Sequence, residues 1–307
     1  MADLSHQRII ALIGPTAVGK SRLGVELAEQ FEGEIISADS RQIYRQLTIG
    51  TAKPSFAELA RIPHHFVDEL DLTESFSAGQ FADAATARIE HIVQRGYTPI
   101  VVGGSTLYVE ALLHGLSDIP ATSEATRAKL MQRLDEHGAD TLFAELRAVD
   151  PESAASMDVT KTQRLVRALE VFYDTGRPLS WYHAQKPVPR FQFTPIVLNR
   201  PRQTLYERIN ERVDRMLEAG LIEENRGLLD SFTDTRSNPL RTIGYREPMA
   251  YLRGEVSYDE MVRLLKRNSR RYAKRQLTWF RRRGEYHWID VEHTQDVVDK
   301  ILQIASA

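Results

Sequence analysis

Short apolar runs alternate with longer amphipathic patterns along the first part of the chain. Apolar runs of strand length lie at residues 9–13, 34–38, 98–102 and 195–198. Apolar residues recur at helical spacing between residues 20 and 31 and again between Phe81 and Val93, where Ser77 and Gln80 form a capping box and Gly96 ends the pattern. Strands followed by crossover helices predict an α/β fold with a parallel sheet flanked by helices.

The strand signals stop between residue 122 and about residue 190. Helical patterns surround residues 127–137, 140–149 and 161–175, and the last one ends at Gly176 followed by Pro178. Three prolines within residues 181–195 predict a linker back into the sheet. We therefore expect a core formed by residues 1–120 and 191–307 and a helical insertion at residues 121–190.

The last third of the chain is predicted to be mostly helical. One helix, with apolar positions from Leu205 to Met216, ends at Gly220, and a second helix follows it. The segment RTIGYRE, residues 241–247, then breaks the pattern with a glycine between two arginines, and this turn either holds an anion or only reverses the chain. Ser257 and Glu260 start a further, long helix.

The chain is nearly neutral, with a formal net charge of −2, but its basic residues are clustered. Residues 263–283 contain ten Arg or Lys residues and no Asp or Glu. Arg263, Arg267, Arg270 and Lys274, here called the cationic rail, are spaced to share one face of the long helix. Because no acidic residues alternate with them, the pattern favours binding of nucleic acid over a merely solvated face.

Composition excludes several kinds of site. The chain has no cysteine, which excludes disulfides, zinc fingers, thiolate nucleophiles and iron–sulfur clusters. An apolar content of 42% is enough for a substantial core. The polar start MADLSHQR shows no signal peptide, and no apolar run approaches the length of a membrane span, so we expect a cytoplasmic protein without a membrane partner.

The segment GPTAVGKS, between a predicted strand and a predicted helix, matches the P-loop pattern in full. In such a loop, backbone N–H groups converge on a phosphate at the positive end of the helix dipole. Lys20 is expected to reach the outer phosphates, and the Ser21 hydroxyl is expected to hold Mg²⁺. The residues expected to bind a pyrophosphate are Gly14, Pro15, Thr16, Ala17, Val18, Gly19, Lys20 and Ser21. The loop alone does not say whether this pyrophosphate belongs to a nucleotide or to another donor.

Polar residues also follow the next two predicted strands. Asp39 ends the second strand, where it either faces the same crevice as the P-loop or caps a helix through residues 40–44. The third strand ends in GGSTLY, where two glycines allow close approach to a ligand and Ser105 presents a hydroxyl. His64 and His65 are adjacent on an extended segment, so they point to opposite faces and are expected to have structural roles.

Several motifs occur in one order along the chain: GPTAVGKS, DSRQIYRQLTIGTAKP, PHHFVDEL, GGSTLY, QRLVRALE, RTIGYRE and KRQLTWFR. In this combination the chain resembles the tRNA dimethylallyltransferase family, also called isopentenyl-pyrophosphate transferases, from about residue 8 to residue 290. The resemblance is to the bacterial type. It implies a P-loop-type core and a helical insertion that helps to grip the anticodon stem-loop. It also implies transfer of a dimethylallyl group from dimethylallyl pyrophosphate to the exocyclic amine of the adenosine just 3′ of the anticodon in certain tRNAs.

The resemblance also implies roles for particular residues. Asp39 becomes the candidate base on the accepting amine, with Ser105 beside it as a catalytic candidate. The family commonly has Gly-Gly-Thr-Gly-Leu-Tyr at this place; here Ser105 keeps the hydroxyl, whereas Thr106 adds bulk beside the expected reaction channel. The residues matched to tRNA contacts are Asp39, Ser40, Arg41, Gln42, Ser105, Arg127, Gln163, Arg164, Leu165, Val166, Arg167, Arg241, Thr242, Ile243, Gly244, Tyr245, Arg246, Lys274, Arg275, Gln276, Leu277, Thr278, Trp279, Phe280 and Arg281.

Three other functions compete with this one. A small-molecule or nucleotide kinase would use the same loop for ATP, but the third strand ends in glycines rather than in an aspartate suited to a metal, and a kinase has no need of the cationic rail. A prenyltransferase of free adenine nucleotides would need neither the insertion nor the basic helix. A purely structural RNA-binding module would not need an intact P-loop. We expect a monomer that acts on tRNA.

Overall fold

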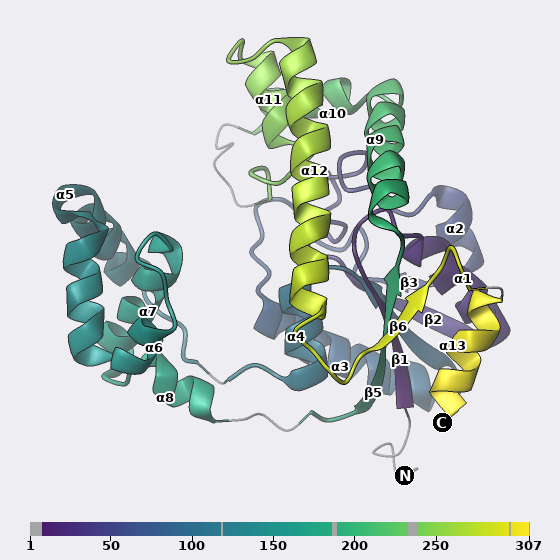
Figure 1. Cartoon of the computed structure of the whole chain (residues 1–307), viewed down its shortest axis with the longest axis horizontal. Coiled ribbons are helices and arrows are strands. Elements are labelled where there is room, and N and C mark those ends of the chain that lie inside the picture. Colours follow the sequence, from purple (N-terminus) through teal and green to yellow (C-terminus); the bar gives the residue numbers. More distant parts are fainter. Residues whose placement is uncertain (1–7, 118, 186–188, 233–238, 295, 307) are drawn as a thin grey trace. The chain divides into compact units, whose positions relative to one another are not determined.

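The structure, a computed structural model, describes residues 8–117, 119–185, 189–232, 239–294 and 296–306. The chain forms two compact units (Figure 1). Residues 1–113 and 189–307 belong to one of them, here called the core unit, and residues 114–188 form the other, here called the insertion unit. None of the helices in the described ranges has the length and apolar character needed to cross a membrane.

The core unit is built on a parallel sheet in the order β3-β2-β4-β1-β5-β6. Its strands are β1 (Arg8–Ile13), β2 (Gly33–Ala38), β3 (His64–His65), β4 (Thr98–Gly103), β5 (Gln192–Asn199) and β6 (His287–Asp290). The four predicted strands are confirmed as β1, β2, β4 and β5, and so is the α/β class with a parallel sheet. Strands β3 and β6 were not predicted, because β3 has only two residues and β6 is mostly exposed and carries little apolar pattern.

Helices cover both faces of this sheet and stand beyond one of its ends (Figure 1). They are α1 (Lys20–Gln30), α2 (Phe56–Arg61), α3 (Ala78–Gln94), α4 (Thr106–His114), α9 (Arg202–Glu218), α10 (Leu221–Ser231), α11 (Arg246–Leu252), α12 (Tyr258–Phe280) and α13 (Val297–Ser306). Phe81 of α3 packs with Ile9 on one face, and Leu27 of α1 packs with Ile10 on the other. Because alternate strand residues point to opposite faces and both faces are covered, the central strands are continuous apolar runs.

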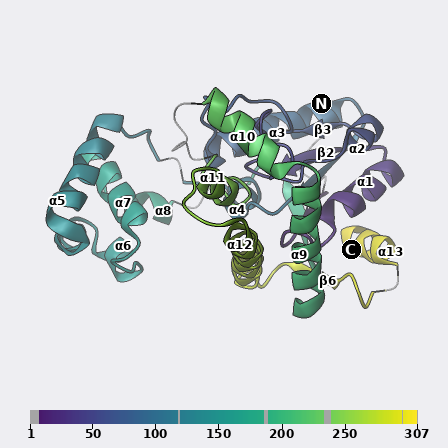
Figure 2. The same cartoon turned by 90° about the horizontal axis from the view of Figure 1, so that it is seen from above.

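Helices α9 and α12 contact each other beyond one end of the sheet. They extend away from the N-terminal end of β1 in Figure 1, and they also lie close to each other in the view from above in Figure 2. The strands of a parallel sheet all end on the same side, so these two helices stand over the carboxyl ends of the strands. Ligands of open α/β sheets bind at that edge.

The segment after β2 consists of turns over residues 40–46, not of a helix. The N–H of Glu69 donates to the Ile43 carbonyl oxygen at 2.9 Å, and the N–H of Arg45 donates to the Leu70 carbonyl oxygen at the same distance. The backbone therefore forms turns and pairs with a distant segment instead of continuing as a helix. The alternative in which Asp39 only caps a helix is wrong.

The insertion unit is helical, with α5 (Glu124–Val149), α6 (Pro151–Ala155), α7 (Thr162–Thr175) and α8 (Leu179–Ala184). Gly138, with φ of 77° and ψ of 169°, interrupts α5 where the sequence predicted two separate helices. The predicted linker at residues 181–195 is wrong at both ends, because residues 181–184 belong to α8 and residues 192–195 belong to β5. Tyr182 explains the first error, since its ring is buried in the core of the unit. Residues 186–188 lie outside the described part of the chain.

Asp150 joins two helices of the insertion unit. Its buried carboxylate accepts hydrogen bonds from the N–H of Ser153, at the start of α6, and from the N–H of Ser180, in α8, both at 3.0 Å. Burial alone would raise the pKa of this carboxyl, but the hydrogen bonds from Ser180 and Ser153 outweigh it and lower the pKa below its usual value of 3.8. Asp150 therefore stabilises the folded unit as a carboxylate.

We predict that Asp150→Asn destabilises the insertion unit by about 1–3 kcal/mol at neutral pH, because an amide side chain cannot accept both hydrogen bonds. The folded-state pKa lies below the unfolded value, so the wild-type advantage is present at neutral pH and is lost as the pH falls through the folded pKa. Chemical unfolding of the full chain at about pH 7 and about pH 3 measures this difference. Asp135→Asn, on an exposed part of α5, is the control. An equal loss at both pH values would contradict the assignment.

Candidate active site

The core unit contains a cavity of about 570 Å³ at the carboxyl ends of β1, β2 and β4. The P-loop, the turns after β2 and β4, and helices α9 and α12 contribute to its lining. Among the described residues that line it, Asp39 is the one carboxylate. Nine lining residues are basic: Lys20, Arg22, Arg41, Arg208, Arg212, Arg215, Arg241, Arg246 and Arg275. This charge balance indicates an anionic ligand.

The P-loop leaves β1 and enters α1 in a conformation that depends on glycine. Gly14 has φ of 148°, and a side-chain carbon there would lie 2.7 Å from the Leu198 carbonyl oxygen. Gly19, with φ of 116°, lies directly before the first residue of α1, Lys20. The loop therefore stands at the positive end of the helix dipole, as predicted.

Arginines before and within α9 form hydrogen bonds to the P-loop. Their hydrogen bonds to the loop measure 3.0–3.1 Å and run from Arg200 to the Val18 carbonyl, from Arg208 to the Ala17 carbonyl and from Arg212 to the Thr16 hydroxyl. These bonds fix the shape of the loop before a ligand binds. Sequence reasoning missed the arginines. The spacing of Arg208 and Arg212 shows that they share a helix face, but not that this face covers the P-loop.

Lys20 and Arg212 bring two basic side chains to the wall of the cavity. Nζ of Lys20 donates to the Pro15 carbonyl oxygen at 2.7 Å. Burial, and then the charge of Arg212, lower the pKa of Lys20 to about 7, while Asp39 opposes the shift. Burial also lowers the pKa of Arg212, although a guanidinium stays charged in proteins. Desolvated cations with a single nearby carboxylate are costly, so a bound anion stabilises this site.

The turns after β2 and β4 meet at Ser105. Its Oγ accepts from the N–H of Ser40 at 2.9 Å, and its N–H donates to the Ala38 carbonyl oxygen at 3.1 Å. A side-chain carbon at Gly103 would lie 2.3 Å from that same oxygen, so only glycine allows this approach. Oδ1 of Asp39 accepts from the backbone N–H two residues later at 2.9 Å. The structure thus brings Asp39 and Ser105 together from two separate strand ends.

Tyr272 of α12 also lines the cavity, and the sequence did not predict it. Burial and the negative charge of Asp39 raise the pKa of its phenol to about 12, while Arg41 and a hydrogen bond with Ser105 act in the opposite direction. The phenol is therefore protonated at neutral pH and can serve as a hydrogen-bond donor beside Asp39.

Residues 49–52 form a further part of the wall and are held from two sides. Gln42 donates from Nε2 to the Ala52 carbonyl oxygen at 3.1 Å. The Glu224 carboxylate, from α10, accepts from the N–H of Ile49 at 2.7 Å. Gln42, predicted to contact tRNA, therefore also fixes the shape of the cavity.

The turn RTIGYRE packs against this wall. Tyr245 is fully buried and donates from its hydroxyl to Glu224 at 2.7 Å. Gly244 has φ of 99°, and a side-chain carbon there would lie 2.7 Å from the Gly50 carbonyl oxygen. The N–H of Gly244 donates to the Glu247 carboxylate at 3.1 Å. The anion bound by this amide is therefore a carboxylate of the protein itself. The members of the turn that line the cavity are Arg241, Thr242, Ile243, Gly244 and Arg246.

Helix α12 lines the cavity with a stripe spaced by four, three and four residues: Leu265, Ser269, Tyr272 and Gln276. Gln276 is only 2% exposed. Its Oε1 accepts from the N–H of Thr16 at 2.9 Å, and its Nε2 donates to the Gly104 carbonyl oxygen at 2.7 Å. Both ends of the carboxamide of Gln276, a residue predicted to contact tRNA, are therefore bonded to backbone groups of the cavity wall.

The inference that the cationic rail and its neighbours lack acidic partners is wrong. Arg263 donates to both carboxylate oxygens of Glu260 at 2.6 Å. Lys266, on the same helix, pairs with Asp214 of α9 at 2.6 Å. Glu260 precedes the basic run, and Asp214 is distant in sequence, so the run itself shows neither partner.

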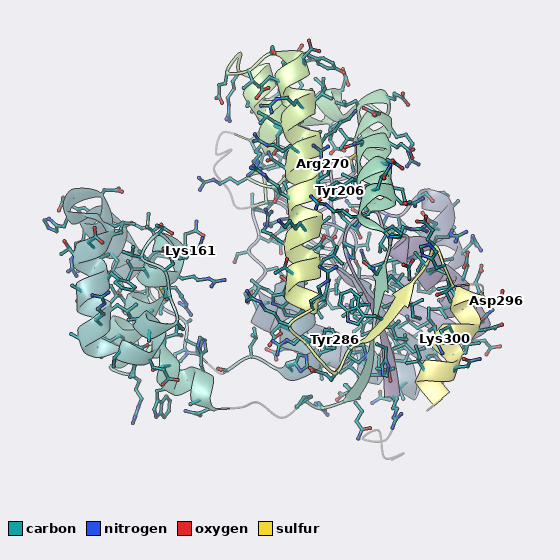
Figure 3. All side chains as sticks on the ribbon, viewed as in Figure 1. Lys161, Tyr206, Arg270, Tyr286, Asp296 and Lys300 are labelled. Atoms are coloured by element: carbon teal, nitrogen blue, oxygen red, sulfur yellow. The ribbon has the colours of Figure 1, made fainter. Side chains whose placement is uncertain are left out.

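Arg270 of the rail also contacts α9. It donates to Oδ1 of Asn210 at 2.6 Å, and its guanidinium lies 6.0 Å from the ring centre of Tyr206 (Figure 3). The basic side chains of α12 that are exposed near the C-terminal half of the helix are Arg271, Lys274 and Arg275, here called the exposed basic face. Thr278 and, just after the helix, Arg281 are also exposed.

Some residues matched to tRNA contacts are core residues instead. Those with no exposed surface (0%) are Leu165, Val166, Tyr245 and Phe280. Leu277 and Trp279 are half-buried, and each packs against a different hydrophobic cluster of the core unit. Within a helical motif, the apolar residues recur at the spacing of the buried face. A match to the motif therefore does not show whether a given residue packs in the core or contacts RNA.

Two arginines of the insertion unit share a buried carboxylate. Glu170 is 1% exposed and accepts from Nη1 of Arg127 at 2.9 Å and from Nη1 of Arg167 at 3.5 Å. These arginines therefore balance a charge of their own unit. Gln163 and Arg164 are the exposed members of the same motif.

The P-loop residue Ser21 is exposed in the first turn of α1. Like Asp39, it lines the cavity. Within the described ranges, no group of three or more His, Cys, Asp or Glu residues is placed to hold a metal ion. A metal ion at Ser21 would therefore take further ligands from a bound phosphate group, which suits Mg²⁺.

Comparison with known proteins identifies the family. The sequence model of the family described as IPP transferase matches residues 42–283, a range that begins after the P-loop. The tRNA dimethylallyltransferase of Salinibacter ruber is 56% identical over 281 residues, which cover 91% of this chain and 87% of that protein.

Solved structures agree with this result. The crystal structure of tRNA isopentenylpyrophosphate transferase from Bacillus halodurans has a TM-score of 0.70 at 41% identity and covers 98% of this chain and 95% of that one. A eukaryotic dimethylallyltransferase acting on tRNA has a TM-score of 0.78 at 28% identity, covering 92% of this chain and 74% of that one. The P-loop, the cationic cavity and these likenesses lead to one conclusion: the chain belongs to the tRNA dimethylallyltransferase (IPP transferase) family.

Proposed function

We propose that the chain transfers a dimethylallyl group from dimethylallyl pyrophosphate to the exocyclic amine of the adenosine just 3′ of the anticodon in a subset of tRNAs, with release of pyrophosphate. The observation that carries this proposal is a cavity with nine basic side chains and one carboxylate. The basic groups suit a pyrophosphate and RNA phosphates. The single carboxylate suits removal of a proton from the accepting amine.

The donor's pyrophosphate is proposed to lie in the P-loop, residues 14–21, against Lys20 and Arg212. Negative charge develops on the pyrophosphate as its bond to the allylic carbon breaks. Cations that are already fixed where this charge develops stabilise it without reorganisation. Arg212 is our candidate for direct contact with the leaving group, because it lines the cavity, hydrogen-bonds to Thr16 of the loop and acts electrostatically on Lys20.

Mg²⁺ fits this site as a partner of the pyrophosphate. The Ser21 hydroxyl lines the cavity at the start of α1. Mg²⁺ prefers oxygen ligands and commonly takes few of them from the protein when phosphates supply the rest. We propose that Ser21 holds the ion, which when bound neutralises charge on the leaving group.

The accepting adenosine is proposed to enter on the side of Asp39. A base in a folded RNA loop must leave its stack before its amine can reach such a cavity. In the transfer, the bond between carbon and pyrophosphate oxygen breaks and a bond between carbon and amine nitrogen forms. Asp39 takes the proton from that nitrogen. Ser105 supports this arrangement through its hydrogen bond with Ser40 in the turn that carries Asp39.

The RNA is proposed to contact the exposed basic face of α12 and the basic residues around the cavity. Arg41, Arg241 and Arg246 line the cavity, and Gln163 and Arg164 are exposed in the insertion unit, which we propose grips the anticodon stem-loop. A tRNA substrate also supports a cytoplasmic location.

A direct assay tests the function. The protein is incubated with Mg²⁺, labelled dimethylallyl pyrophosphate and either tRNA or AMP, and both label and pyrophosphate are followed. Label in tRNA alone, with release of pyrophosphate, is the expected result. Label in AMP would indicate a prenyltransferase of free nucleotides, phosphoryl transfer from ATP to a hydroxyl acceptor would indicate a kinase, and tRNA binding without transfer would indicate an RNA-binding module.

We predict that Asp39→Asn lowers the single-turnover transfer rate by about 10²–10⁴-fold, the usual range for loss of a general base, and changes tRNA affinity far less. Rapid mixing of saturating enzyme with labelled donor and tRNA measures the rate. Asp83→Asn, on an exposed position of α3, is the matched control. Comparable rates for Asp39→Asn and the wild type would rule out this role.

For Arg212→Gln we expect kcat/KM for the donor to fall by about 10²–10³-fold, because a fixed positive charge is removed where negative charge develops. Binding of tRNA, measured by filter retention, should change little. Arg202→Gln is the control on the same helix, since Arg202 is exposed and stacks on Tyr206 instead. If both substitutions have the same small effect, another basic residue contacts the leaving group.

The pair Lys274→Gln and Arg275→Gln should weaken tRNA binding and make the logarithm of affinity fall less steeply with the logarithm of salt concentration. The slope should become shallower by roughly 0.7–0.9 for each RNA phosphate that the protein no longer neutralises. Arg263→Gln should change the slope less, because both carboxylate oxygens of Glu260 already engage its guanidinium. An unchanged slope for the double substitution would exclude binding of phosphates at the exposed basic face.

A further inference from the structure

Gln276 is a buried polar side chain that joins three separate parts of the sequence. It lies on α12, in the stripe that lines the cavity, and only 2% of it is exposed. Its Oε1 accepts from the N–H of Thr16 in the P-loop at 2.9 Å. Its Nε2 donates to the Gly104 carbonyl oxygen in the turn after β4 at 2.7 Å. Both ends of the carboxamide are therefore bonded to backbone groups of the cavity wall.

The two backbone partners belong to different halves of the site. Thr16 lies in the loop proposed to hold the donor's pyrophosphate. Gly104 directly precedes Ser105, which bonds to the turn that carries Asp39. A side-chain carbon at Gly104 would lie 2.6 Å from Nε2 of Gln276, so the glycine lets the carboxamide reach the backbone. Gln276 is thus a direct side-chain link between the donor side and the acceptor side.

The chemistry of these partners requires a carboxamide. An N–H faces one end of the side chain and a carbonyl oxygen faces the other, so the residue must offer an acceptor and a donor on neighbouring atoms. A carboxylate keeps the bond to Thr16 but places an oxygen against the Gly104 carbonyl oxygen. An apolar side chain of the same length offers neither bond.

We infer, on the basis of the proposed function, that Gln276 is a positioning residue that sets the distance between the P-loop and the Asp39–Ser105 pair. Transfer needs the donor carbon and the accepting nitrogen at reacting distance, and a displacement of about 1 Å can cost on the order of 10²-fold in rate. Two hydrogen bonds from one rigid carboxamide hold the two sides in register. Gln276 acts through Thr16 and Gly104 and has no role in proton transfer.

The link also belongs to the helix that carries the exposed basic face. Lys274 and Arg275 immediately precede Gln276 and are exposed, while Gln276 points into the protein. One turn of α12 therefore offers charge to RNA on one side and holds the donor loop on the other. Substitutions at these neighbouring positions should consequently have separable effects: loss of tRNA affinity for Lys274 and Arg275, and loss of transfer rate for Gln276.

Two substitutions test the inference. Gln276→Met removes both hydrogen bonds and Gln276→Glu removes only the bond to Gly104. The matched controls are Gln30→Met and Gln30→Glu at the exposed end of α1. Each variant of the full chain is examined for affinity for inorganic pyrophosphate with Mg²⁺, for tRNA affinity by filter retention, and for single-turnover transfer at saturating donor and tRNA. Thermal unfolding shows what fraction of each variant is folded at the assay temperature.

For Gln276→Met we expect a loss of roughly 10- to 100-fold in transfer rate together with weaker pyrophosphate binding. For Gln276→Glu we expect a loss of transfer rate of the same order with pyrophosphate affinity closer to that of the wild type, because the Thr16 bond is kept. Affinity for tRNA should stay within about three-fold for both, a change of less than 1 kcal/mol.

A merely structural role predicts a different result. The folded fraction would then fall and the rate per folded molecule would be unchanged, or both variants would lose every activity in proportion. Either result overturns the inference, and so does a wild-type transfer rate in Gln276→Glu. Failure of the wild type itself to transfer label to tRNA would instead overturn the proposed function, so the two failures are distinguishable.

Discussion

Positive charge held inside a protein cavity is the constraint on which the core unit depends. Burial lowers the pKa of both Lys20 and Arg212, the charge of Arg212 lowers the pKa of Lys20 further, and the carboxylate of Asp39 opposes both shifts. Repulsion and desolvation would drive such groups outward unless the surrounding backbone held them. The carbonyl oxygens of Pro15 and Thr51 and the hydroxyl of Thr16 accept their hydrogen bonds. The protein thus maintains a site that a bound anion would stabilise.

The walls of this site come from elements that are distant in sequence. Helix α9 supplies arginines to the P-loop, and α12 supplies Gln276 and Tyr272. Glycines make the necessary close approaches, at Gly103 against the end of β2 and at Gly104 against Gln276. A larger residue at Gly103 would push apart the turns that carry Asp39 and Ser105, and one at Gly104 would displace Gln276. The geometry of the reaction is therefore set by backbone contacts as much as by the residues that meet the substrates.

The insertion unit uses its charged residues in another way. Asp150 and Glu170 are buried and are satisfied by hydrogen bonds within the unit. Two arginines matched to tRNA contacts in the sequence, Arg127 and Arg167, form hydrogen bonds to Glu170. Gln163 and Arg164 are exposed and remain candidates for contact. The difference follows from burial, because a carboxylate removed from water requires partners of its own.

The sequence by itself determined the P-loop, the parallel α/β class and the polar residues at the strand ends, because these depend on local spacing and on the continuous apolar runs of buried strands. Asp39 and Ser105 could be predicted for the same reason: both follow a recognisable strand. Only the tertiary structure decided which residues surround the P-loop, since Arg208, Arg212 and Gln276 reach it from helices far along the chain. It also decided that Arg263 and Arg270 have partners, and that Tyr245 and Phe280 are core residues. Helical spacing tells which residues share a face, but packing decides what that face meets.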